Sequence, residues 1–143
     1  MRTPLLILSL VLGSAASAQD GSPSGLRFAP LDVTMDCDGA PLAAYQLELV
    51  ADGDAQIVGV EGGESKPFSD APYYDPAALM HGRIVVAAFS TAADLPSTSP
   101  RLLTLHLRLA GAEPTFSLKV IASVDREGRP IACRFDLKHR SQP

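Results

Sequence analysis

The sequence predicts an all-β protein, an antiparallel β-sandwich, and three observations support this fold class. Apolar and polar residues alternate with a period of two along several short segments, which is typical of strands that bury one face. Twelve Pro and eleven Gly divide the chain into short pieces, which favours strands and turns over long helices. No segment carries a sustained helical stripe of apolar residues. Two packed sheets account for all three observations.

The alternation predicts seven or more short strands, each bounded by turn residues. The clearest pattern is that of 103–109, where four leucines alternate with Thr, His and Arg. By contrast, 84–89 is apolar without interruption, so we expect that strand to be buried on both faces. In chain order, the expected strands cover 31–37, 45–49, 57–60, 84–89, 103–109, 116–124 and 131–137.

Two connections are longer than ordinary turns between strands. Residues 62–82 contain several prolines and a Tyr-Tyr pair, and 91–100 is rich in Ser, Thr and Pro. Structureless loops beyond about 12–15 residues are uncommon in compact domains and are often functional. The first connection also predicts one helical turn near 76–80, because Asp75 suits the N-cap and Pro76 the first helical position. Both connections either cap the ends of the sandwich or carry a binding site.

The first residues predict export. Arg2 precedes an apolar run from Leu5 to Leu12, and small residues follow as far as Ala18. Because this run is much shorter than the ~20 residues that span a bilayer, it is typical of a cleaved signal peptide. We expect a signal peptide over 1–18, a mobile lead-in over 19–26, the sandwich over 27–138 and a tail over 139–143. The expected location is periplasmic or extracellular in a bacterium, without membrane insertion after cleavage.

The charge of the chain bears on its partners. Twelve Lys and Arg face sixteen Asp and Glu, for a formal net charge of −4, and no basic cluster occurs. Nucleic acids and anionic membranes attract patches of Lys and Arg. We therefore expect no nucleic-acid partner.

The two cysteines are candidates for a disulfide. Cys37 ends the first expected strand and Cys133 lies in the last, each in the apolar phase, so both side chains are expected to point into the core. An even number of cysteines in an exported protein favours a bond between them. Such a bond requires the first and last strands to be neighbours. The alternative is a pair of buried free thiols.

Side chains that catalyse reactions or bind metals do not converge in the sequence. His81, His106 and His139 lie in a loop, on a strand and in the tail, without ligand spacing. Ser90 and His106 lack the nucleophile elbow of a hydrolase triad. The aspartates are expected on a solvated strand face and in turns rather than around Ca²⁺, since they lack EF-hand spacing. We expect no enzymatic activity, no metal and no cofactor.

Aromatic residues supply the candidate binding site. The chain has no Trp, the residue on which sugar rings often stack, and Tyr45 falls in the apolar phase of its strand and is expected in the core. Tyr73 and Tyr74, with Phe68 nearby, are expected to form an aromatic ledge on the long connection. Such a ledge suits a polysaccharide or a protein partner. Packing that anchors the loop is the alternative.

The order of these segments resembles that of cohesin-type domains. The resemblance covers roughly residues 28 to 137 and is a pattern of strands and turns, not a catalytic signature. It rests on 31–37, on Ala-Tyr-Gln-Leu-Glu-Leu over 44–49, on 57–61, on Gly82 to Ser90, on Leu103 to Leu109, and on the final hairpin at 125–131.

The resemblance implies a jelly-roll sandwich of about eight or nine strands whose first and last strands lie side by side. Cohesins are non-catalytic modules that bind dockerins, and they share their fold with carbohydrate-binding modules. We therefore expect an exported module that binds a dockerin-like or unknown protein, and the alternative is a carbohydrate-binding module. This chain departs from the pattern of scaffoldin cohesins in its cysteine pair and in lacking repeats. No dockerin-facing residue is carried over.

Overall fold

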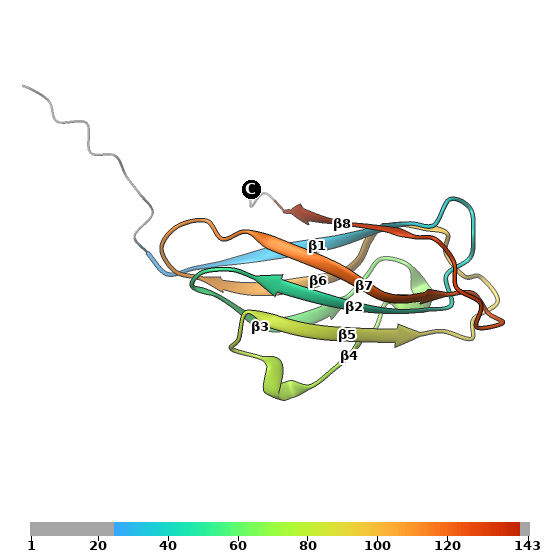
Figure 1. Ribbon diagram of the computed structural model, residues 1–143, viewed down its shortest axis with the longest axis horizontal. Helices are drawn as coiled ribbons and strands as arrows, with labels where there is room; N and C mark the ends of the chain where they lie inside the picture. The colour runs from blue at the N-terminus through green and yellow to red at the C-terminus, as the bar shows by residue number, and fades with distance from the viewer. Residues whose placement is uncertain (1–24, 141–143) are drawn as a thin grey trace, which may run out of the picture.

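Two four-stranded sheets pack face to face in the computed structural model, which describes residues 25–140 (Figure 1). The predicted signal peptide over 1–18 and most of the lead-in over 19–26 lie outside the described residues. The strands are β1 (Arg27–Asp36), β2 (Ala44–Ala51), β3 (Ala55–Gly62), β4 (Tyr73–Tyr74), β5 (Arg83–Phe89), β6 (Thr98–Leu109), β7 (Phe116–Val124) and β8 (Arg134–His139). Two 3-10 turns, η1 (Lys66–Phe68) and η2 (Pro76–Ala78), complete the elements.

The strand order is β3-β6-β1-β8 in one sheet and β4-β5-β2-β7 in the other. Every named strand pair is antiparallel. The predicted fold class, an all-β antiparallel sandwich, is therefore confirmed. The expected helical turn is present as η2, where the Asp75 carboxylate accepts a hydrogen bond from the backbone N–H of Ala77 at 2.9 Å.

The core lies between the sheets and consists of the apolar side chains that each central strand points inward. In β6, the four alternating leucines from Leu103 to Leu109 are at most 1% exposed. They face Leu47, Leu49 and Ile84 of the other sheet, which are also buried. Burying each such side chain stabilises the fold by about 1.5–3 kcal/mol relative to exposure. The period-two pattern therefore encodes the packing of the sandwich.

Several strand boundaries differ from expectation; for example, β8 begins at Arg134 rather than at 131. β1 begins at Arg27 rather than at 31, because β6 continues alongside it and pairs Leu109 with Arg27. At its other end, β6 begins at Thr98, so the second long connection is shorter than expected. The predicted tail begins too early, since His139 ends β8 and the backbone N–H of Arg140 donates to Pro30 O at 3.4 Å.

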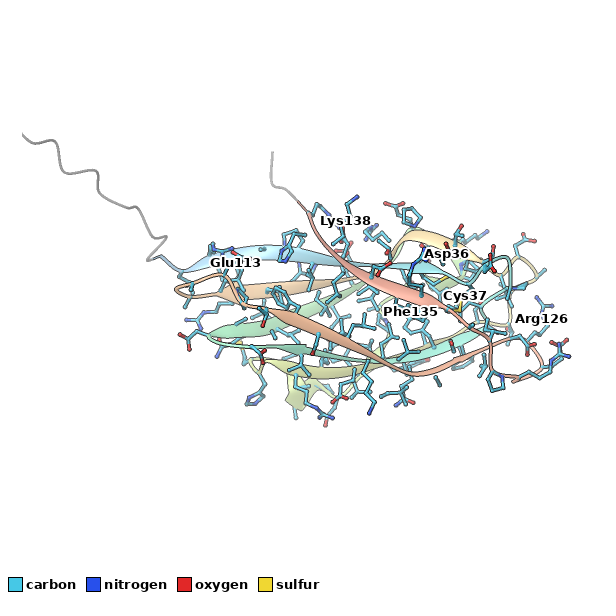
Figure 2. The ribbon with its side chains drawn as sticks, turned by 45° about the horizontal axis from the view of Figure 1, so that its top comes forward. Asp36, Cys37, Glu113, Arg126, Phe135 and Lys138 are labelled. Atoms are coloured by element: carbon cyan, nitrogen blue, oxygen red, sulfur yellow. A yellow bond between two sulfur atoms is a disulfide. The ribbon has the colours of Figure 1, made fainter. Side chains whose placement is uncertain are left out.

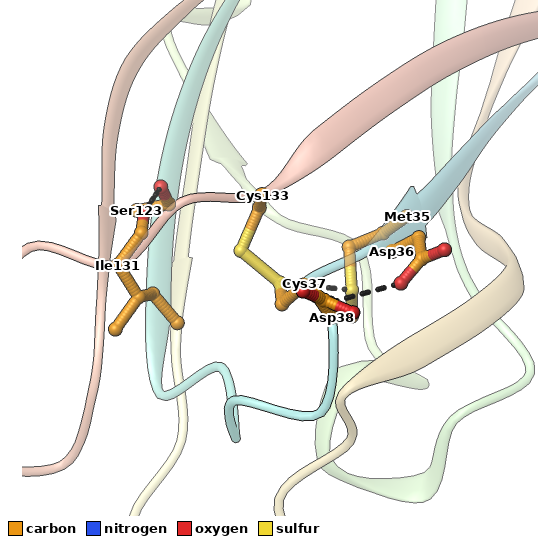
Figure 3. The surroundings of a disulfide bond; sticks show 7 residues. All are labelled: Met35, Asp36, Cys37, Asp38, Ser123, Ile131 and Cys133. Carbon is orange, nitrogen blue, oxygen red and sulfur yellow. Dashed lines mark hydrogen bonds between the residues drawn. A yellow bond between two sulfur atoms is a disulfide. The ribbon is translucent and has the colours of Figure 1, made fainter.

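A disulfide joins Cys37, just after β1, to Cys133, just before β8, with their Cα atoms 4.0 Å apart (Figure 3). The bond is possible because β1 and β8 are neighbours in the sheet, as expected. Cys37 is buried, whereas Cys133 is only half-buried. The predicted pairing is confirmed, and a buried disulfide is compatible with an oxidising, exported location. Within residues 25–140, no helix is long and apolar enough to cross a membrane.

We predict that removing the disulfide lowers the free energy of unfolding by about 2–5 kcal/mol, because the bond closes a loop across most of the chain. The variant is Cys37→Ala/Cys133→Ala, and urea unfolding followed by circular dichroism measures the change. Reducing agent should lower the midpoint of the wild type and leave that of the double variant unchanged. Equal midpoints for the two proteins under oxidising conditions would contradict the prediction.

Candidate functional site

The three predicted aromatic site residues do not form one ledge. Tyr73 is 72% exposed, whereas Phe68 is 3% exposed and belongs to the core. The Phe68 ring packs edge-to-face on Tyr45, with ring centroids 5.4 Å apart. Tyr74 is half-buried and packs against the same core. The expectation that Phe68 shares a surface patch with the tyrosines is therefore wrong, and only Tyr73 offers an open ring.

The connection between β3 and β5 is folded onto the sandwich, which explains why Phe68 is buried while Tyr73 is exposed. Phe68 anchors it from inside, and Phe68 O accepts a hydrogen bond from the backbone N–H of Gly63 at 2.8 Å. A Cβ on Gly63 would lie 2.2 Å from Arg101 O, so only glycine fits this close approach. Further on, β4 pairs with β5. Successive side chains of a strand alternate between faces, so Tyr74 points inward and Tyr73 outward.

A second exposed aromatic residue, Phe89, lies beside Tyr73 and was not among the predicted site residues. The two rings are stacked, with centroids 6.3 Å apart and planes at 11°, and Phe89 is 66% exposed. The expectation that 84–89 is buried on both faces is wrong. Within this segment only Ile84 and Val86 are fully buried, because no element of residues 25–140 covers the outside of this sheet.

These rings border a flat apolar area on the outer side of the β4-β5-β2-β7 sheet, which we call the apolar face. One cross-strand row contains Tyr73, Ala87, Gln46 and Ala122, and the next contains Phe89, Ala44 and Val124. The same residues line a shallow depression in the surface. Gln46 is the one polar side chain in the two rows. Small side chains leave the area flat, so a partner's surface can approach the backbone closely.

A row with two charged side chains limits the apolar face on the side away from Phe89. Val85, Glu48 and Lys119 lie across from one another on β5, β2 and β7. The Glu48 carboxylate is paired with Arg83 of the adjacent strand, and Lys119 is exposed. Charged groups along one border of an apolar area are consistent with the polar rim of a protein interface.

The outer side of the opposite sheet is polar. Asp32 on β1 is only 8% exposed. Its carboxylate accepts hydrogen bonds from Arg140 at 2.6 and 3.0 Å and from the Thr104 hydroxyl at 2.7 Å. Burial raises the pKa of Asp32, but the hydrogen bonds from Arg140 and Thr104 outweigh it and hold that pKa below its usual value. These contacts fix the end of β8 onto the sheet, which is a structural role.

The histidines lie in separate places. His106 is on the outer side of β6, with Nε2 3.0 Å from a Glu61 oxygen. His139, at the end of β8, packs against Phe116, and His81 is bridged to Ile57. Ser90 follows β5, a strand of the sheet opposite that of His106. The structure brings none of these groups together, and residues 25–140 contain no group of three or more side chains that could hold a metal ion.

A hollow at the disulfide end of the sandwich also contains charged groups, but they hold loops in place. Figure 2 shows Arg126 at this end of the molecule, where its guanidinium donates to Ala92 O at 2.7 Å and Ala93 O at 3.0 Å. The neighbouring Asp125 accepts from Arg129 Nε at 2.9 Å. The Arg126 contacts fasten the β7–β8 connection to the β5–β6 connection, and the Asp125–Arg129 contact holds the β7–β8 connection together.

The fold and these surfaces together define a β-sandwich with one polar and one apolar outer side. No family model, curated protein or solved structure matches this chain. The resemblance to cohesin-type domains therefore stays a prediction from the sequence.

We predict that truncating two aromatic residues changes the free energy of unfolding by very different amounts. Phe68→Ala should lower the free energy of unfolding by about 3–5 kcal/mol, because it empties part of the core and frees the connection. Tyr73→Ala should change it by less than about 0.5 kcal/mol, because the ring is mostly exposed. Urea unfolding of both variants measures these effects. An equal loss of stability in the two variants would refute the assignment of Tyr73 to the surface.

We further predict that Asp32 makes stability depend on acid pH. Because its pKa is lower in the folded than in the unfolded chain, its contribution is complete above an unfolded pKa of about 3.9 and is lost as pH falls through the folded value. Asp32→Asn should therefore flatten the decline in unfolding free energy below about pH 4. Urea unfolding at a series of pH values tests this, with the exposed Asp70→Asn as the control. An undiminished decline in Asp32→Asn would exclude this role.

Proposed function

We propose that the protein is an exported, non-catalytic binding module of cohesin-like type that attaches a protein partner through its apolar face. The observation that carries this proposal is the exposure of two adjacent aromatic rings, Tyr73 and Phe89, beside the small side chains of Ala44, Ala87 and Ala122. The expected cellular location is periplasmic or extracellular, and the partner is dockerin-like or unknown.

Burial energetics support a macromolecular partner. Covering an exposed Phe or Tyr ring contributes about 1.5–3 kcal/mol each, and aromatic residues are frequent among those that dominate binding energy. Ala44, Ala87 and Ala122 keep the surroundings of the rings level, which lets a partner exclude water over a continuous area. The Glu48–Arg83 pair and Lys119 supply the polar rim. The opposite sheet lacks this combination, because its central carboxylate is already engaged by Arg140 and Thr104.

A carbohydrate ligand is the second candidate, and one observation favours it. The rings of Tyr73 and Phe89 are stacked on each other, at 11°, and both are mostly exposed, so a sugar ring can stack on an open aromatic face. Gln46 lies in the same row as Tyr73 and offers a donor and an acceptor to hydroxyl groups.

We predict that the purified protein, immobilised and exposed to envelope extract and culture fluid, retains one dominant protein. Tyr73→Ser/Phe89→Ser should reduce the retained amount at least about tenfold, because both rings leave the interface. Phe28→Ser is the matched control, since Phe28 is 59% exposed on the other sheet, and it should bind like the wild type.

Two results would contradict the proposal in different ways. A protein retained equally by the double variant would place its binding surface elsewhere. Retention on polysaccharide that the double variant loses, without any retained protein, would establish the carbohydrate ligand instead. Each assay repeated with a Ca²⁺ chelator shows whether the interaction resembles the Ca-dependent binding of dockerins.

A further inference from the structure

We infer that the apolar face also binds a second copy of this chain, forming a symmetric dimer in which the two β4-β5-β2-β7 sheets pack face to face. The two-fold axis lies in the interface, parallel to the strands and between β5 and β2. This inference goes beyond the proposed function: it uses the same surface but names this chain itself as an occupant.

The shape of the face is self-complementary. Its two aromatic rings, Tyr73 and Phe89, lie on the β4–β5 half, and Ala44 and Ala122 lie in the same rows on the β2–β7 half. Rotation about the proposed axis exchanges the two halves and leaves each cross-strand row at its level along the strands. Tyr73 therefore comes to lie over Ala122 of the second copy, and Phe89 over Ala44. Each copy thus places its protruding rings where the other has small side chains, as an isologous interface requires.

The charges beside the face are complementary under the same rotation. Lys119 is exposed at the β7 edge, in the row of Glu48 and Val85. At the opposite edge, β4 pairs with β5 as far as Tyr74 and Val86, and the next residue, Asp75, has an extended backbone that continues toward the level of Val85. The rotation therefore brings Lys119 of each copy opposite Asp75 of the other. Asp75 is exposed, and only its Oδ1 accepts the Ala77 N–H.

The size of the face sets the strength of this dimer. Four strands at about 4.8 Å spacing make a face roughly 20 Å across, and the apolar part covers only two rows of it. An interface this small lies at the low end of specific contacts. The dimer is therefore weak and forms reversibly at high protein concentration.

Sedimentation equilibrium of the purified protein, from micromolar to near-millimolar concentration, tests the inference. The expected result is a reversible monomer–dimer equilibrium. Phe89→Ser and Lys119→Glu should each raise the dissociation constant about tenfold, because each change acts twice in a symmetric dimer. Asp75→Lys should do the same, and combining it with Lys119→Glu should restore the dissociation constant to within about threefold of wild type. Phe28→Ser should leave it unchanged, and circular dichroism checks the fold of each variant.

Three results would overturn the inference. The first is a monomer at every concentration, and the second is a dimer that neither Phe89→Ser nor Lys119→Glu weakens. The third is failure of the Lys119→Glu/Asp75→Lys combination to recover association. The proposed function fails separately: a monomer that still captures a partner through Tyr73 and Phe89 excludes only the dimer. A dimer that captures no protein excludes only the attachment of a different protein.

Discussion

The rest of the structure depends on one constraint: the inward-pointing side chains of β6 must be buried. β6 pairs with both β1 and β3, and its leucines from Leu103 to Leu109 fill the centre of the core. A shift of one residue would turn these leucines outward and expose every one of them. The registers of β1 and β3 follow from pairing with this strand. The neighbouring register of β1 with β8 then brings the two cysteines together.

The side chains that point inward from both sheets form the core, so the side chains that point outward can differ between the two sheets. On the β3-β6-β1-β8 sheet, the outward residues form a hydrogen-bonded network in which Arg140 closes on Asp32 and Thr104. On the β4-β5-β2-β7 sheet, they include alanines and two stacked exposed rings. Exposed aromatic rings contribute little to the stability of the folded chain, and covering them would strengthen an interaction. This asymmetry assigns a structural role to one outer side and supports an interaction role for the other.

Period-two alternation was enough to predict the strands and the buried Tyr45, because each depends on a local pattern. The disulfide prediction also needed the even number of cysteines and the expectation of export. Of the three aromatic residues predicted to form a surface ledge, only Tyr73 is largely exposed. Phe89 was missed because the uninterrupted apolar run 84–89 has the composition of a strand covered on both faces. Whether another element covers the outer face of this strand depends on the whole fold, not on the local sequence. Phe68 was misplaced for the related reason that a long connection can fold back and bury a side chain. The Asp32–Arg140 pair joins residues 108 positions apart, and no local signal predicts such a contact.

The central claim is that the outer side of the β4-β5-β2-β7 sheet is the interaction surface. The most direct test compares the solvent accessibility of the two outer faces of the sandwich as protein concentration rises. Methyl NMR spectra with a soluble paramagnetic probe would be recorded over a range of protein concentrations. The methyl groups of Ala44, Ala87 and Ala122 should become protected from the probe as concentration rises, while Thr34 on the opposite sheet stays equally accessible. Protection of Thr34 without protection of the alanines would contradict the account, because the polar side would then be the surface that associates.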